Sequence, residues 1–129
     1  MIKPLGLGVL GLGEGRSIIS AGMHSPLWEV ACLCDTNAAL AQERCAEFGL
    51  RRYTTDYAEL LADPAVDVVG IYTPDHLHAD HIIRALAAGK HVICTKPFID
   101  DLSRAHDVLA AQARSGKQVM VGQSTRFFA

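Results

Sequence analysis

Short apolar runs alternate with longer segments of helical period along this chain of 129 residues. The runs are rich in Val, Ile and Leu, which is typical of strands in a parallel sheet that is covered on both faces. We therefore predict an α/β fold with a doubly wound, mainly parallel, six-stranded sheet. The expected strands are residues 5–10, 28–34, 52–53, 66–72, 91–95 and 118–122.

Three of the longer segments place apolar residues at helical spacing, and a glycine follows each of them. We expect caps at Thr36 or Asn37 for the first and at Asp100 or Asp101 for the third. The apolar stripes are Ala38, Ala41, Cys45 and Phe48 before Gly49; Ala79, Ile82, Ile83, Leu86 and Ala87 before Gly89; and Leu102, Ala105, Leu109 and Ala113 before Gly116.

Composition describes an ordinary globular chain, with half of the residues hydrophobic, a fifth charged and a formal net charge of -2. No basic stretch favours a nucleic-acid partner. The apolar run at residues 4–13 is too short to span a bilayer, so we expect neither a membrane segment nor a targeting segment. The four cysteines show no Cys-x-x-Cys spacing, which favours buried reduced thiols and a cytoplasmic location.

A glycine-rich turn follows the first expected strand and precedes a segment that suits a helix. Glycines at such a turn let the backbone approach a pyrophosphate at the helix N-terminus. The spacing departs from G-x-G-x-x-G because position 16 is Arg, whose guanidinium can instead meet a phosphate. A strand-to-helix turn without a ligand is the alternative. The candidate cofactor-binding residues here are Gly11, Leu12, Gly13, Gly15 and Arg16.

Asp35 ends the second expected strand, where an acidic residue accepts hydrogen bonds from the ribose hydroxyls of a dinucleotide. A carboxylate there disfavours a 2′-phosphate, and Thr36 rather than an arginine follows it. We therefore expect NAD in preference to NADP, with both residues near the cofactor. The alternative role for Asp35 is a helix cap, and the two roles are compatible.

Thr73 and Pro74 close the fourth expected strand, at the edge where ligands bind open α/β sheets. Their alternative role is only to end a strand and start a helix. The nearby histidines suggest a metal site, but His76 and His78 lie nearly half a helical turn apart. His78 and His81 align better, yet no further ligand completes a set, so we expect no metal.

Lys96 follows the fifth expected strand. At that edge a positive charge can polarise a hydroxyl or carbonyl group and assist proton movement. A lysine after a strand is more often simply solvated. The case for Lys96 therefore depends on its position relative to the glycine turn.

Together these motifs resemble the glucose-fructose oxidoreductase/inositol dehydrogenase/rhizopine-catabolism family. The motifs are Gly11 to Gly15, Asp35, the run from Thr73 to His78, the run from Ala88 to Pro97 and the run from Val121 to Phe127. The resemblance implies that residues 1–122 are the N-terminal Rossmann domain of an NAD(P)-dependent sugar or polyol dehydrogenase. Residues 123–129 would begin the connection to an α+β substrate domain, which supplies substrate contacts and the interface of a homo-oligomer.

The resemblance also implies roles for single residues. Thr73, Pro74 and His78 line the nicotinamide side, and Lys96 is the catalytic lysine of the Glu-Lys-Pro signature, in which Thr95 replaces the usual Glu. The isolated chain is therefore expected to bind cofactor with little turnover. Two alternatives remain open: a regulatory protein that senses the cofactor, and a domain for NAD-assisted cleavage of glycosides.

Overall fold

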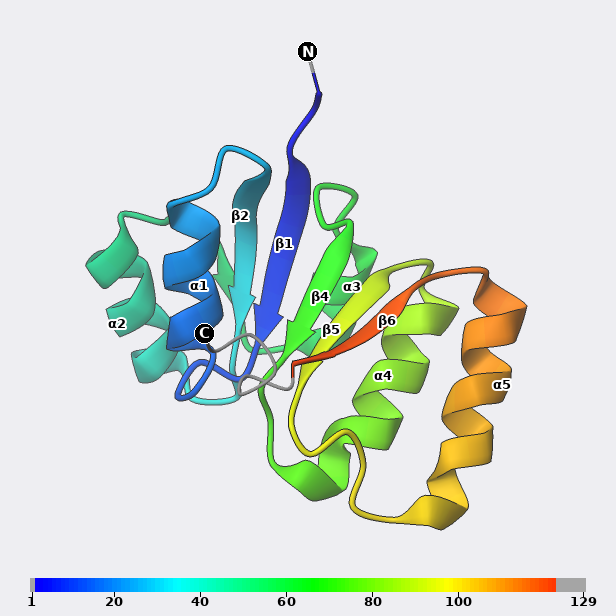
Figure 1. The fold of residues 1–129 in the computed structure, drawn as a ribbon. Helices are drawn as coiled ribbons and strands as arrows, with labels where there is room; N and C mark the ends of the chain where they lie inside the picture. Colours follow the sequence, from blue (N-terminus) through cyan, green and yellow to red (C-terminus); the bar gives the residue numbers. More distant parts are fainter. Residues whose placement is uncertain (1, 123–129) are drawn as a thin grey trace, which may run out of the picture.

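Six parallel strands form one sheet in the order β3-β2-β1-β4-β5-β6 (Figure 1). The computed structural model describes residues 2–122. The strand order reverses between β1 and β4, as in doubly wound folds, and confirms the predicted fold class. The strands are β1 (Leu5–Leu10), β2 (Trp28–Cys34), β3 (Tyr53–Thr54), β4 (Val68–Ile71), β5 (His91–Thr95) and β6 (Val119–Gly122).

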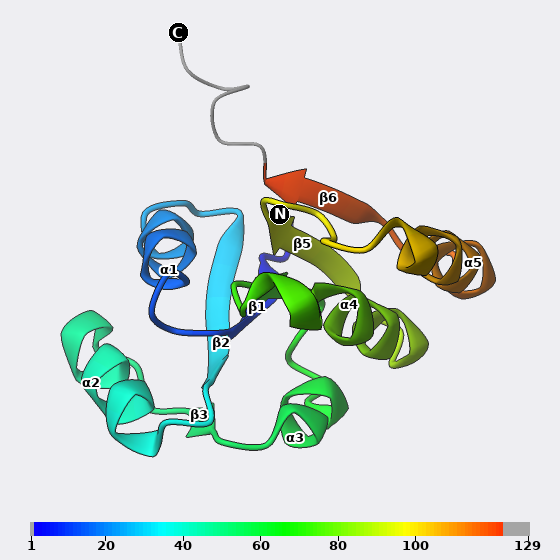
Figure 2. The same cartoon turned by 90° about the horizontal axis from the view of Figure 1, so that it is seen from below.

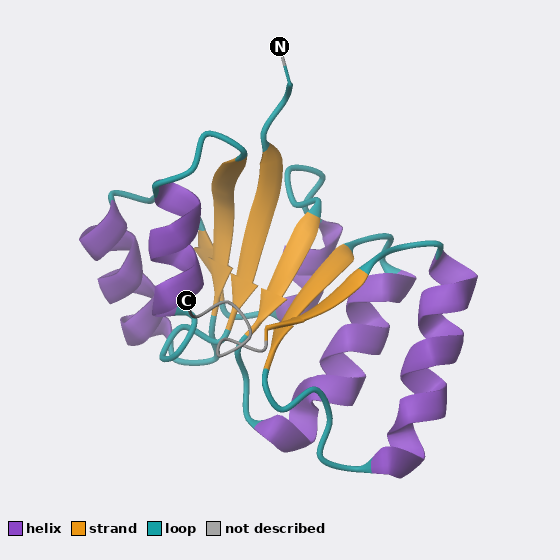
Figure 3. Cartoon of the chain, in the orientation of Figure 1, coloured by secondary structure: helices purple, strands orange, loops and turns teal. Residues whose placement is uncertain are grey.

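Helices cover both faces of the sheet. Helices α1 and α2 lie on one face, and α3, α4 and α5 lie on the other (Figure 2), so the sheet is the middle layer (Figure 3). Two short 3-10 helices, η1 and η2, lead into α4 and α5. The helices are α1 (Arg16–Met23), α2 (Ala38–Phe48), α3 (Tyr57–Ala62), η1 (Asp75–Leu77), α4 (His78–Ala87), η2 (Leu102–Arg104) and α5 (Ala105–Ser115).

Strands β1, β2 and β5 have the predicted bounds, whereas β3, β4 and β6 differ by one or two residues. Strand β4 begins later than expected because Val66 closes a turn, where its N–H donates to the carbonyl oxygen of Asp63 at 3.1 Å. Helix α3 was not expected from the sequence. It has six residues and is capped by Asp56, whose carboxylate accepts from the N–H of Ala58 at 2.9 Å.

The predicted helix ends are confirmed in detail. Asn37 caps α2, since its side-chain oxygen accepts from the N–H of Leu40 at 3.1 Å. Asp101 caps η2 in the same way through the N–H of Ser103 at 2.9 Å. Gly49, Gly89 and Gly116 follow their helices with positive φ angles, which glycine adopts without steric cost.

The stripe predicted for α5 was wrong. Leu109 is 56% exposed and Leu102 in η2 is 84% exposed, whereas Val108 and Ala111 are buried. Helix α5 lies beside α4 at the β6 edge of the sheet (Figure 1), and only one narrow side of it faces these neighbours. The helix has two sets of apolar residues at helical spacing. The packing against α4 buries the set with the smaller residues, Val108 and Ala111, and leaves the set with Leu109 exposed.

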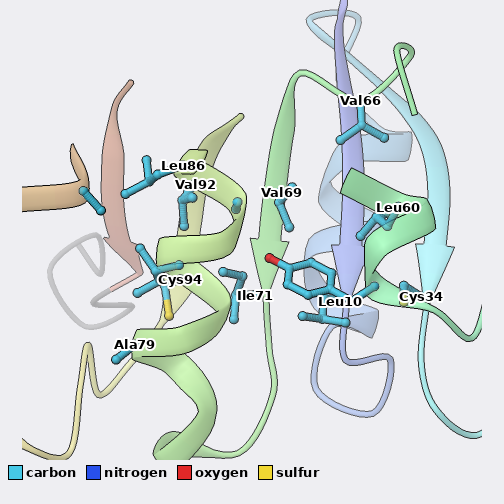
Figure 4. Packing of buried hydrophobic residues seen from close by; sticks show 14 of the residues in the cluster. Leu10, Cys34, Leu60, Val66, Val69, Ile71, Ala79, Leu86, Val92 and Cys94 are labelled. Carbon is cyan, nitrogen blue, oxygen red and sulfur yellow. The ribbon is translucent and has the colours of Figure 1, made fainter. Parts of the chain in front are cut away.

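The core consists of two hydrophobic clusters, one on each face of the sheet. On one face, Leu7 and Leu33 pack with Ile19 of α1 and Ala41 of α2. On the other face, side chains of the sheet meet those of α3 and α4 (Figure 4). These include Val69, Ile71, Val92 and Cys94 from the strands and Leu60, Ala79 and Leu86 from the helices.

All four cysteines are free and buried, as predicted. Burial raises the pKa of both Cys34 and Cys94 to about 12. These thiols therefore remain protonated at neutral pH and belong to the packing of the core. Within residues 2–122, no helix has both the length and the apolar character needed to cross a membrane.

Candidate functional site

A cleft of about 730 Å³ opens at the carboxyl edge of the sheet, where β1 and β4 lie side by side. The chain leaves β1 toward α1 on one face and leaves β4 toward α4 on the other. The two connections diverge and leave a crevice, which is where open α/β sheets bind ligands. Seven of the residues predicted from the sequence line it: Gly11, Leu12, Gly13, Asp35, Thr36, Thr73 and Pro74.

The first two glycines of the turn have different roles. Gly11 has a φ of 89°, and a Cβ added there would lie 2.5 Å from the carbonyl oxygen of Tyr72. This position therefore requires glycine, because β1 and β4 leave the sheet in close contact. A Cβ added at Gly13 would meet nothing within 4 Å, so the space beside it is open.

Gly15 allows α1 to pack closely against the turn. A Cβ at this position would lie 2.1 Å from the carbonyl oxygen of Gly11 and 2.9 Å from a methyl carbon of Val9. Gly15 is also the residue before the first turn of α1. It thus performs the packing role of the third glycine of the dinucleotide pattern, although it comes one residue early.

The turn presents backbone donors at the start of α1. Among the residues that the structure describes, the N–H groups of Gly13 and Glu14 have no hydrogen-bond acceptor. Unpaired N–H groups at a helix N-terminus attract anions, and the helix dipole adds to this attraction. The residues present therefore fit a pyrophosphate group.

Asp35 is fixed at the end of β2 by two backbone donors. One carboxylate oxygen accepts from the N–H of Leu12 at 2.9 Å, and the other accepts from the N–H of Asn37 at 2.9 Å. Each oxygen keeps a further lone pair. Because Asp35 also lines the cleft, the carboxylate can accept hydroxyl donors from a ribose. Asn37, rather than Asp35, caps α2.

The structure places Arg16 away from the cleft, contrary to expectation. Its guanidinium pairs with Glu47 of α2, and Nε donates to Oε2 at 2.6 Å. This pairing raises the pKa of Arg16 and lowers the pKa of Glu47. Arg44 joins the same pair and donates from Nε to the carbonyl oxygen of Leu12 at 2.9 Å. The arginines thus connect α2 to α1 and to the glycine turn.

The opposite wall of the cleft contains a group that the sequence analysis missed. Tyr57, His81 and Arg84 all line the cleft. The Tyr57 hydroxyl donates to the carbonyl oxygen of His81 at 2.7 Å, and the Arg84 guanidinium lies 4.7 Å from the centre of the Tyr57 ring. His81 Nδ1 lies 2.9 Å from Thr73 Oγ1. The only signal in the sequence was the i, i+3 spacing of His81 and Arg84 on α4.

Burial lowers the pKa of His81, and the positive charge of Arg84 lowers it further. The imidazole is therefore mostly neutral near pH 7. A neutral ring can form one hydrogen bond with the Thr73 hydroxyl. This bond holds the Thr73 side chain in the wall of the cleft.

His78 does not line the cleft, although the family resemblance implied that it would. Its ring is fully buried, and both ring nitrogens contact backbone carbonyl oxygens. Lys96 is exposed and also lies outside the lining of the cleft. Ile71 of β4 is paired with Cys94 of β5. Thr73 comes two residues after Ile71, and Lys96 comes two residues after Cys94. Lys96 and Thr73 therefore leave the sheet at the same edge, and the Lys96-Pro97 peptide bond is cis.

Metal ligation has no support in the geometry of residues 2–122, where no three His, Cys, Asp or Glu side chains gather around one point. The polar groups at the cleft include the backbone N–H donors of the glycine turn and the Asp35 carboxylate, which accepts hydrogen bonds. This set suits a phosphorylated ligand with ribose hydroxyls better than an ion.

Comparison with known proteins gives a consistent result. The family described as "Oxidoreductase family, NAD-binding Rossmann fold" matches residues 5–123. The chain is 37% identical over 106 residues to levoglucosan dehydrogenase of Pseudarthrobacter phenanthrenivorans, covering 75% of this chain and 27% of that protein. It is 30% identical over 123 residues to scyllo-inositol 2-dehydrogenase (NAD(+)) of Bacillus subtilis, covering 95% and 35%.

Among solved structures, the chain resembles KijD10, a 3-ketoreductase from Actinomadura kijaniata in complex with TDP-benzene and NADP. The TM-score is 0.85 at 31% identity, and the match covers 93% of this chain and 38% of that one. The chain thus spans between 27% and 38% of the length of these three proteins.

Proposed function

Because the chain belongs to the oxidoreductase family with an NAD-binding Rossmann fold, we propose that residues 1–122 form the cofactor domain of a dehydrogenase for sugars or polyols. The substrate would be a secondary alcohol of a sugar, inositol or related polyol. The names of two relatives, levoglucosan dehydrogenase and scyllo-inositol 2-dehydrogenase, support this class of substrate.

The observation that carries the proposal is the pairing of Asp35 with the glycine turn. One carboxylate oxygen accepts from Leu12 within the turn, so the ribose acceptor and the phosphate donors form one rigid unit. The N–H groups of Gly13 and Glu14 would hold the pyrophosphate, and Asp35 would hold the adenosine ribose. We propose NAD as the preferred cofactor, since a carboxylate repels the 2′-phosphate of NADP.

A bound nicotinamide ring accepts or supplies the hydride. Lys96 would lie beside that ring and assist the movement of a proton at the substrate oxygen. Residues 123–129 would begin the connection to a second domain, which would supply most substrate contacts and the interface of a homo-oligomer. With the roles divided in this way, the present chain would bind the cofactor but turn over little substrate.

Calorimetric titration of the 129-residue chain with NAD and with NADP tests the proposal. We expect saturable binding of both, with NAD the tighter ligand, and no measurable turnover of polyols. The absence of saturation with either dinucleotide would refute the cofactor domain. Tighter binding of NADP would refute the role of Asp35 and leave the domain assignment intact.

Thr95 supports a second candidate, a regulatory protein that binds the cofactor as a signal. It stands where the family signature has Glu, so no carboxylate precedes Lys96. A chain extended beyond residue 129 separates the two functions. Formation of NADH that depends on an added polyol supports the dehydrogenase, whereas tight NAD binding without turnover supports the regulator. Sugar release without net NADH would instead identify NAD-assisted glycoside cleavage.

A further inference from the structure

His78 joins two segments of the chain that come from neighbouring strands. Its Nε2 lies 2.8 Å from the carbonyl oxygen of Thr73, which follows β4. Its Nδ1 lies 2.8 Å from the carbonyl oxygen of Pro97 and 3.2 Å from that of Phe98, which follow β5. The side chain is fully buried, so water does not compete for these bonds.

The chemistry of the contacts gives each ring nitrogen a defined role. Carbonyl oxygens only accept hydrogen bonds, so a nitrogen bonds to them only when it carries a proton. Nδ1 faces two oxygens and Nε2 faces one. A ring with one N–H therefore satisfies more contacts when that N–H is at Nδ1.

The segment that His78 holds is the one that carries Lys96. Residues 96–101 form neither helix nor strand, and Lys96 and Pro97 are exposed. Phe98 and Ile99 pack only partly against the core. Within residues 2–122, the hydrogen bonds from Nδ1 to the two residues after Lys96 are thus the side-chain contacts that tie this segment to the rest of the domain.

We propose that His78 is a positioning residue, which holds the Lys96 segment in register with the Thr73 wall of the cleft. This inference rests on the proposed function, in which Lys96 lies beside the nicotinamide ring. His78 touches neither cofactor nor substrate. It sets the position of Lys96 through the peptide groups of Pro97 and Phe98.

Two amide substitutions distinguish the contact of His78 with the Pro97 segment from its contact with Thr73. In His78→Asn, the amide nitrogen can take the place of Nδ1 and donate to the Pro97 segment, while the contact with Thr73 is lost. In His78→Gln, the longer side chain puts the amide group near the place of Nε2, so the bond to Thr73 can form and the Pro97 contact is lost. His106→Gln, at an exposed position on α5, is the matched control.

The first measurement uses the cofactor-free chain and follows the Phe98 and Ile99 amides by NMR, because their peptide groups contain the two carbonyl oxygens that face Nδ1. We expect His78→Gln to shift both amide signals, since these carbonyl groups lose their donor. His78→Asn and His106→Gln should keep the wild-type shifts. Equal effects of the Asn and Gln variants would show that His78 only fills space in the core, and would overturn the proposal.

The second measurement adds NAD and records intermolecular NOEs. In the wild type and in His78→Asn we expect contacts from the Lys96 side chain to the nicotinamide protons. In His78→Gln these contacts should be lost, while NOEs from Leu12 and Thr36 to the adenosine protons remain. If the wild type binds no NAD, the proposed function fails. If it binds and all variants keep the Lys96 contacts, the positioning role alone fails.

If both variants unfold, the position of the proton on the His78 ring of the wild type tests the proposal. Long-range 1H–15N spectra of His78 should show a proton on Nδ1 that is protected from exchange and has an NOE to the Phe98 segment. A ring that carries its only proton on Nε2 would lack the bond to the Pro97 segment and would overturn the proposal.

Discussion

Asp35 is the residue on which cofactor selectivity depends in the proposed function. Replacing it by Ala removes the acceptor for the ribose hydroxyls and the anchor of the Leu12 and Asn37 N–H groups. We expect the Kd for NAD to rise about ten- to hundredfold, since a hydrogen bond to a charged group contributes about 1.5–3 kcal/mol. Affinity for NADP should fall much less. Calorimetry with both dinucleotides measures the ratio.

The matched control for this change is Asp107→Ala on α5, which removes an exposed carboxylate far from the cleft. It should leave both affinities at their wild-type values. If Asp35→Ala also leaves them unchanged, the ribose lies elsewhere in the cleft and the argument for NAD preference is wrong.

Lys96 tests the division between binding and chemistry. Its side chain is exposed and lies outside the lining of the cleft. Lys96→Ala should therefore change the NAD affinity of this chain by less than about twofold, within the range expected for an exposed side chain. In a longer chain with substrate turnover, the same change should lower kcat far more than it raises the Kd for NAD. A large loss of NAD affinity in the short chain would instead place Lys96 on the cofactor phosphates.

His81 gives a pH dependence with a definite sign. Burial and the charge of Arg84 lower its pKa below the usual 6.5 in the folded state. As pH falls through 6.5 the unfolded chain binds the proton first, so the folded state loses stability. We expect the free energy of unfolding to drop more in the wild type than in His81→Asn between about pH 7.5 and about pH 5.5. Urea titrations measure this, with exposed His106→Asn as the control that keeps the wild-type slope.

The glycine turn offers a test at the level of one structural element. A methyl group at Gly15 would clash with the carbonyl oxygen of Gly11, whereas at Gly13 it would enter open space. We expect Gly15→Ala to destabilise the fold by about 1–3 kcal/mol, the usual cost of overpacking. Gly13→Ala should keep nearly full stability but weaken NAD binding, because its methyl group occupies the place of the pyrophosphate. Chemical denaturation and calorimetry separate the two effects.

Elements with a strong local signal could be predicted from the sequence, and weaker ones could not. Strands β1, β2 and β5 are mainly apolar runs, and the residue types of Asn37 and Gly49 mark the two ends of α2. Helix α3 has only six residues, which are too few to establish a helical repeat in the sequence. The buried side of α5 depends on how it meets α4, and this is a property of the assembled layers.

The same distinction between local and tertiary signals applies to the residues of the candidate site. Gly11, Gly13 and Asp35 were accessible from the sequence because each serves a function set by its position at a strand end. The contacts that hold Arg16 and His78 outside the lining of the cleft could not be predicted, because their partners, Glu47 and the Pro97 segment, lie 31 and 19 residues away along the chain. Contacts of that kind arise from the tertiary fold, and no local sequence pattern predicts them.

At the scale of the whole molecule, the cleft lies where the two halves of the sheet meet. Its walls come from β1, β2 and α2 on one side and from α3, α4 and the segment after β4 on the other. The two hydrophobic clusters lie on opposite faces of the sheet, and one of them joins the two halves, since it contains Leu10 of β1 as well as Ile71 of β4. A ligand that spans the cleft contacts both halves at once, so its binding energy is added to the cooperative stability of the domain.

This coupling predicts that NAD protects the entire fold against heat. A ligand at about one hundred times its Kd stabilises the native state by about 2.7 kcal/mol, which corresponds to a rise in Tm of roughly 10 °C for a domain of this size. Differential scanning fluorimetry across a series of NAD concentrations measures the rise, with ADP-ribose as a ligand that lacks the nicotinamide ring. We expect both to raise Tm, and Asp35→Ala to shift the NAD series to higher concentrations. An unchanged Tm at high NAD concentration would mean that the native domain does not bind the dinucleotide.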